Sequence, residues 1–102
     1  MNGQSPTPNT MRSVAQMATP HASRYLQQLC KHFAHKIPAT FDEKTGQVDF
    51  PFGTCMLEAG DGVLKLSLSS PDEAQLTQLE GVVERHLLRF AFREDLTVDW
   101  SR

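Results

Sequence analysis

Three histidines stand at corresponding places in two stretches whose apolar residues recur at helical spacing. His32 and His35 lie near the end of a predicted helix over 19–36, and His86 lies in a second predicted helix over 70–92. At about 100° per residue, His32 falls roughly 80° from the centre of its apolar stripe and His86 roughly 60° to the same side of its own stripe. Equal offsets place both side chains either in the groove between two neighbouring helices or on their outer flanks. In the groove, the two side chains could come close enough to form a site.

The spacing of His32 and His35 puts them on neighbouring helical turns, from which two imidazoles can bind one metal ion. His86 could supply a third ligand, so a zinc or iron site on these three residues is one hypothesis. A His-x-x-His pair is a weak signal, however. A histidine at the edge of an apolar stripe is more often half-buried with one hydrogen bond, and this structural interpretation is favoured for each residue.

Basic residues form a ridge along each predicted helix. The ridges are Arg85, Arg89 and Arg93 on the second helix, and Arg24, Lys31 and His35 on the first. Arginine binds carboxylate and phosphate groups through two hydrogen bonds, so two facing ridges would attract an anion. We therefore take four residues as candidate ligands for a small anion: His32, His86, Arg89 and Arg93. The alternative is a solvated face with local ion pairs, such as Arg89 or Arg93 with Glu94 or Asp95.

Motifs of the common catalytic classes are missing. The sequence has no nucleophile elbow, no Gly-rich phosphate loop before a helix and no Cys-x-x-Cys pair. Its acidic residues are scattered over predicted turns and exposed strand positions, which does not suggest paired acid and base groups. We assign no catalytic residue and favour a binding or accessory module over an enzyme.

Both helices have start signals. Thr19 suits an N-cap and Pro20 the first helical position, while Pro38 prevents continuation past residue 37. In the second helix, Ser70 as N-cap with Glu73 three residues later predicts a capping box.

Strand-like segments surround the helices. Alternating or short apolar runs predict strands at 12–18, 37–41, 47–52, 54–59 and 63–69, and a last strand through Leu96, Val98 and Trp100. The order β-α-β-β-β-β-α-β, with short hairpin turns, predicts an α+β two-layer sandwich: a mostly antiparallel sheet with both helices on one face. Phe41, Phe50, Phe52, Leu57 and the Leu64 row should form the sheet side of the core. Residues 1–11 should be a disordered tail before a single domain over 12–102.

Composition narrows the function classes. The chain has 102 residues and a net charge of −2, so nothing draws it to nucleic acid or to an anionic membrane. Cys30 and Cys55 are expected to be buried free thiols, and without a signal peptide the expected location is cytoplasmic. A homodimer or other protein-interaction module using the outer sheet face is a further alternative, although the positions expected there are mostly polar.

Several segments together resemble a bacterial family of unknown function, DUF2218. They are residues 19–26, 32–36, 50–55 and 86–94, and Trp100. The resemblance implies a small stand-alone bacterial protein, and the joining of some members to siderophore-interacting flavoproteins implies a link to iron handling. It brings no activity, and it marks His32, His35, His86, Arg89, Arg93 and Glu94 as motif positions. The order of elements is also similar to that of the TATA-binding-protein-like fold.

Overall fold

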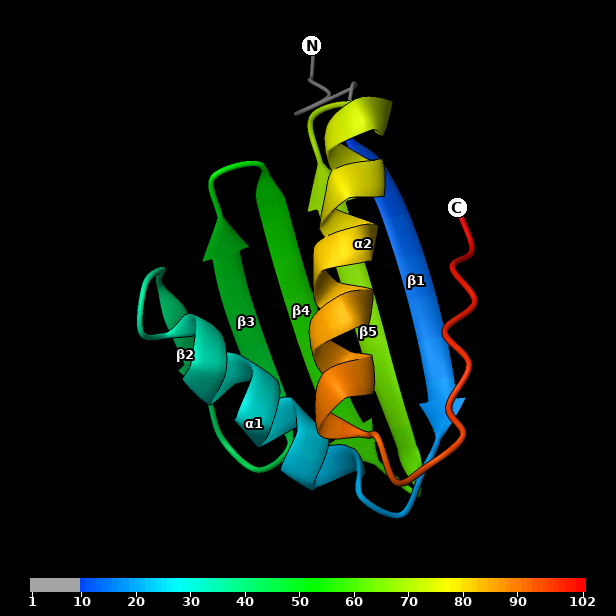
Figure 1. Ribbon diagram of the computed structural model, residues 1–102. Coiled ribbons are helices and arrows are strands. Elements are labelled where there is room, and N and C mark those ends of the chain that lie inside the picture. The colour runs from blue at the N-terminus through cyan, green and yellow to red at the C-terminus, as the bar shows by residue number, and fades with distance from the viewer. Residues whose placement is uncertain (1–9) are drawn as a thin grey trace, which may run out of the picture.

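The computed structural model describes residues 10–102, which form two layers: a five-stranded sheet and two helices on one of its faces (Figure 1). The element order is β-α-β-β-β-β-α, and the predicted α+β sandwich is confirmed. Most of the predicted tail over 1–11 lies outside the described residues. No helix in the described range is long and apolar enough to cross a membrane.

The sheet is antiparallel throughout. Its strands are β1 (Met11–Ala18), β2 (Ala39–Phe41), β3 (Thr45–Phe50), β4 (Gly53–Gly60) and β5 (Val63–Ser70), in the spatial order β1-β5-β4-β3-β2. Strands β2 to β5 follow one another as a meander, and β1 lies beside β5. Alternation along β5 buries Leu64, Leu66 and Leu68 under the helices, as predicted.

Phe41 departs from the predicted core. Its register partner Gly46 places it on the helix side of the sheet, yet 37% of it remains exposed. Strand β2 is the edge of the sheet, so no further strand lies beyond Phe41 to cover its ring. Phe50 and Phe52 are half-buried against the core.

Helix α1 (Ala22–Phe33) is shorter than predicted at both ends. Its N-cap is His21 and not Thr19, whose hydroxyl instead accepts a hydrogen bond from the His21 amide at 3.1 Å. Thr19 is 2% exposed and its hydroxyl also bonds to Glu94, so a distant contact determines its place. The predicted N-cap at Thr19 was therefore wrong.

Helix α2 (Glu73–Phe90) begins with Asp72 as N-cap, whose carboxylate accepts hydrogen bonds from the Gln75 amide at 2.8 Å and the Gln75 side chain at 3.0 Å. The predicted capping box at Ser70 was wrong. Ser70 continues β5, where it pairs with Met11 and donates a hydrogen bond to the Phe52 carbonyl. Pairing with β1 therefore delays the start of the helix by two residues.

The C-terminal segment does not form the predicted last strand. Backbone pairing with β1 is confined to Val14 and Ser101, joined by two hydrogen bonds of 2.9 Å. Figure 1 shows the C-terminal segment as a coil beside β1. Side chains hold the segment to α2: Trp100 donates to Glu84 at 3.0 Å, and the Arg102 guanidinium donates to the Glu80 carboxylate at 2.9 and 3.1 Å. These contacts hold the chain along the helix side, so a continuous ladder beside β1 does not form.

The two cysteines are buried and free, as predicted. Burial raises the pKa of Cys30 to about 11 and raises that of Cys55 as well. The thiolate is the reactive form of cysteine, so neither residue is a nucleophile at neutral pH.

Candidate functional site

A cleft of about 470 Å³ opens where the C-terminal end of α1 approaches the second half of α2. Its lining consists of His32, Phe33, His35, Lys36, Ile37 and His86. Five of these six residues come from the end of α1 and the turn that follows it, and α2 contributes His86. We call this feature the histidine cleft.

The rings of His32 and His86 lie 5.0 Å apart, centroid to centroid, at an angle of 45°. Of the two arrangements that the sequence allowed, the structure has the one with both side chains between the helices. Each ring also contacts Phe33, at 5.3 Å from His32 and 4.8 Å from His86. The packing of two helices therefore brings together two residues that are far apart in the sequence.

His86 has a defined tautomer. Its Nδ1 lies 2.7 Å from the backbone carbonyl oxygen of Val82, one turn earlier in α2. A carbonyl oxygen only accepts hydrogen bonds, so Nδ1 carries the hydrogen. In the neutral ring, Nε2 therefore keeps its lone pair, which can accept a proton, a hydrogen bond or a metal.

Positive charge surrounds His32. Although His32 is exposed, desolvation by the surrounding protein lowers its pKa below the ordinary 6.5, and the neighbouring His86, His35, Arg89 and Lys36 lower this pKa further in that order. A positive charge on any of these neighbours disfavours the protonated form of the His32 imidazole. An anion in the cleft would relieve this repulsion, so the charge distribution suits a negatively charged ligand.

We expect His32 to titrate below 6.5 in an NMR pH titration of the histidine ring resonances. Arg89→Gln should move the midpoint upward, because it removes one of the positive charges that lower the pKa. The matched control is Arg85→Gln, one turn away, which should leave the midpoint where it is. A wild-type midpoint at or above 6.5 would contradict this charge distribution.

The arginines of the predicted ridge on α2 lie in different surroundings. Arg89 is exposed and acts on the charge of His32. Arg93 lies beyond the end of α2, outside the lining of the cleft, with its guanidinium carbon 5.4 Å from the centre of the Phe92 ring. Arg85 is turned toward Gly81, one turn back along α2. Like Arg93, Arg89 is not among the residues that line the cleft, and its influence on His32 is electrostatic.

The predicted local ion pairs of this ridge are not formed. Both ion pairs found within residues 10–102 belong to Arg102, which contacts Glu80 at 2.9 Å and Glu73 at 3.5 Å. Arg89 and Lys36 are exposed near the histidine cleft and take part in neither pair. Arg24 and Lys31, of the ridge on α1, are exposed but lie outside the cleft lining.

The metal hypothesis concerns the three histidines of the cleft. His35 lines the same cleft as His32 and His86, but the described chain contains no group of three or more His, Cys, Asp or Glu residues arranged to hold a metal ion. The donors that could contact a metal here are imidazole nitrogens, and in His86 the hydrogen bond of Nδ1 to Val82 leaves Nε2 as the available nitrogen.

Glu94, one of the family motif positions, connects the start of α1 to the segment after α2, away from the histidine cleft. Its carboxylate accepts hydrogen bonds from the Thr19 hydroxyl at 2.9 and 3.0 Å and from the Tyr25 hydroxyl. The bond from Tyr25 is the main cause that lowers the Glu94 pKa. Burial, followed by the bond to Glu94, raises the Tyr25 pKa to about 12. Glu94 is thus a structural residue that ties the start of α1 to the end of α2.

The pH dependence of stability should report this contact. A carboxylate with a lowered pKa stabilises the fold above the ordinary glutamate value of 4.5, and this contribution is lost as pH falls through the lower value of the folded state. We expect Glu94→Gln to destabilise the protein most at pH near 7, with the difference from wild type shrinking in acid. Urea unfolding at a series of pH values measures it. Glu43→Gln, in the exposed β2–β3 turn, is the control. A difference that did not change with pH would contradict this assignment.

The sequence interpretation missed three residues of the cleft: Phe33, Lys36 and Ile37. A signal was available, because Phe33 and Ile37 are one helical turn apart and follow the His32 side of the stripe. Pro38 obscured it by marking Ile37 as the end of the element.

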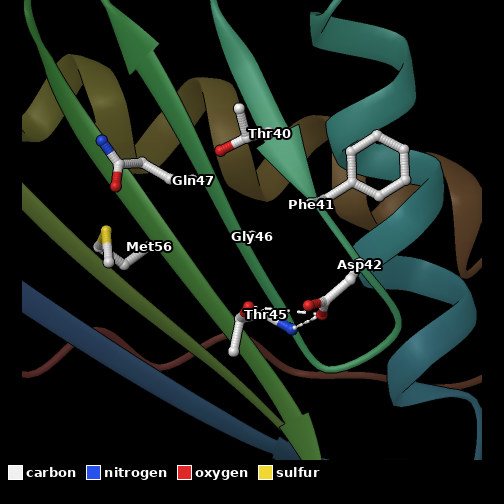
Figure 2. Close-up of a pocket in the computed structure, with 7 residues that line it drawn as sticks. All are labelled: Thr40, Phe41, Asp42, Thr45, Gly46, Gln47 and Met56. Carbon is white, nitrogen blue, oxygen red and sulfur yellow. Dashed lines mark hydrogen bonds between the residues drawn. The ribbon is translucent and has the colours of Figure 1, made fainter.

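A second hollow, of about 330 Å³, lies beside the β2–β3 hairpin, between Phe41 and Met56 (Figure 2). Its one carboxylate, that of Asp42, accepts hydrogen bonds from the amides of Lys44 and Thr45, both at 2.8 Å. These bonds lower the Asp42 pKa and serve the turn. The hollow offers no free charged group, so the histidine cleft is the stronger candidate site.

Comparison with known proteins agrees with this architecture. Residues 14–101 match the family DUF2218, described as an uncharacterized protein conserved in bacteria. The NMR structure of PA4090 from Pseudomonas aeruginosa is similar with a TM-score of 0.75 and 37% sequence identity, over 88% of this chain and 94% of that one. Among curated proteins, none matches the chain.

Proposed function

Since the chain belongs to the bacterial DUF2218 family, whose function is uncharacterized, we propose from the geometry that it is a non-catalytic binding module for a small anion. The anion occupies the histidine cleft between α1 and α2. The observation that carries the proposal is the close approach of His32 and His86, 5.0 Å apart, with Lys36 and Arg89 beside them.

Charge supports the proposal. His32 is surrounded by four positive or potentially positive groups, and each of them raises the cost of protonating it. Two of these groups, Lys36 and Arg89, are cations at neutral pH that form no ion pair with the described residues. A carboxylate or phosphate would accept charge-assisted hydrogen bonds from them.

The lining also supports binding over catalysis. The cleft holds imidazoles, a lysine and two apolar side chains, but neither a carboxylate nor a hydroxyl. General acid–base or nucleophilic chemistry of the familiar kinds combines a histidine with such a group. The residues of the cleft are suited to holding an anion by charge and shape.

An NMR titration with phosphate, citrate and acetate tests this function, at constant ionic strength set with sodium chloride. We expect the His32 and His86 resonances to shift together in wild type and the shifts to be lost in the double variant K36Q/R89Q. The matched control R12Q/K65Q removes the same two charges from the opposite face of the sheet. The proposal fails if no anion shifts these resonances, or if the control loses the shifts equally.

The metal alternative is tested in the same way with Zn²⁺ and Fe²⁺. If His32, His35 and His86 respond together at one metal equivalent, the site is a metal site, as the link to siderophore-interacting flavoproteins would favour. That link and any homodimer through the outer sheet face stay predictions.

A further inference from the structure

The histidine cleft is much larger than an inorganic anion. A water molecule occupies about 30 Å³ in the liquid, whereas the cleft measures about 470 Å³. This is within the range of pockets that bury small organic molecules. A phosphate held by Lys36 or Arg89 would leave most of this space to water, so the size favours a ligand with a body as well as a charge.

The walls of the cleft are largely aromatic. The rings of Phe33, His32 and His86 form a triangle, with Phe33 at 5.3 Å from His32 and 4.8 Å from His86, and Phe50 contacts Phe33 at 5.0 Å. The plane of the Phe33 ring makes angles of 76° with the His32 ring and 73° with the Phe50 ring, so both are edge-to-face contacts. A planar ring in the cleft would therefore meet both faces and edges of fixed rings, which is the arrangement that aromatic groups prefer.

Apolar contact and charge lie on the same short stretch of chain. Phe33 and Ile37, both half-buried, flank His35 and Lys36, both exposed, in the stretch that begins with the last residue of α1 and continues into the following turn. A ligand with its apolar part against Phe33 and Ile37 has its anionic part beside Lys36 and the histidines. One small molecule can satisfy both, provided that its charge sits at the end of its apolar body.

We infer that the ligand of the histidine cleft is an aryl carboxylate, a planar aromatic ring that carries one carboxylate group. This inference rests on the proposed anion site and names its ligand class. The ring lies against Phe33, Ile37 and the two imidazoles, and the carboxylate accepts hydrogen bonds from Lys36 or Arg89.

Four probes of graded chemistry test the inference: acetate, cyclohexanecarboxylate, naphthoate and the uncharged naphthamide. Affinities come from the shifts of the His32 and His86 resonances at constant pH and ionic strength. We expect naphthoate to bind at least about tenfold more tightly than acetate and about threefold more tightly than cyclohexanecarboxylate, because the aromatic contact is specific to a planar ring. Naphthamide should bind more weakly than naphthoate.

Two variants place the ligand. Ile37→Asn makes one apolar wall polar, so it should weaken the binding of naphthoate and have little effect on the binding of acetate. Ile37→Val is the matched control. Lys36→Gln should weaken both carboxylates. The amide spectrum of each variant shows whether the fold is retained.

The outcomes separate this inference from the proposed function. If acetate and phosphate shift the two histidines but naphthoate binds no more tightly, the aryl class is overturned and the anion site stands. If naphthamide binds as tightly as naphthoate, the cleft binds rings without using its charge, and both proposals fail. If naphthoate instead shifts the resonances of residues beside Phe41 and Met56, the ligand occupies the hollow beside the β2–β3 hairpin and the inference is overturned.

Discussion

Replacing Gly53 by alanine should destabilise the protein by about 3 kcal/mol, one of the two largest effects that we expect from a single substitution. A Cβ atom at this position would lie 2.5 Å from the backbone oxygen of Ser69 and 2.8 Å from a methyl carbon of Leu79. The backbone cannot move without disturbing the β4–β5 pairing of Thr54 with Ser69. Gly53 also has φ +156°, a conformation that residues with a side chain rarely adopt.

Gly60→Ala is the matched control. Gly60 ends the same strand, β4, but a Cβ there would meet nothing within 4 Å. Its effect should stay within about 0.5 kcal/mol. Denaturant unfolding measures both changes, and a loss of about 3 kcal/mol should lower the midpoint of thermal unfolding by roughly 15 °C for a domain of this size. Equal stabilities of the two variants would show that the sheet accommodates a side chain at Gly53.

Leu87→Ala should also cost about 3 kcal/mol. Leu87 is fully buried in the stripe of α2 that packs on the sheet, together with Leu76, Leu79 and Val83. Removing its methyl groups takes apolar surface out of the core and leaves a cavity that the rigid sheet below cannot fill.

The next residue provides the comparison, since Leu88 has the same side chain but is only half-buried. Leu88→Ala should cost about 1 kcal/mol, because the solvent already reaches part of the side chain. Both variants are compared by chemical denaturation under identical conditions. If Leu88→Ala costs as much as Leu87→Ala, the stripe of α2 is wider than the burial of its residues indicates.

Local patterns predicted the elements well because a helix or a strand is recognised over a few neighbouring residues. The stripe of Tyr25, Leu26 and Leu29 repeats at helical spacing, and Leu64, Leu66 and Leu68 alternate as a strand does. Each pattern reports which face is buried, so two layers and an antiparallel sheet followed from it.

The ends of the elements were harder to predict, since distant residues compete for the same polar groups. Thr19 has the chemistry of an N-cap, but its hydroxyl is bonded to Glu94, 75 residues away. Ser70 also has that chemistry, but pairing with Met11 keeps it in β5. The last segment alternates like a strand, yet the bonds of Trp100 and Arg102 to α2 hold it beside the helix.

For the candidate site, the sequence by itself determined the chemistry and the direction of the side chains. Equal offsets of His32 and His86 from their stripes required both to lie on corresponding sides, and this follows from helix geometry alone. Tertiary structure decided that these sides face each other, that Phe33, Lys36 and Ile37 complete the cleft, and that Arg93 lies over Phe92 outside it. The reason is that periodicity specifies an angle about each helix axis, whereas the approach of two helices depends on the sheet beneath them and on contacts such as Glu94 with Tyr25.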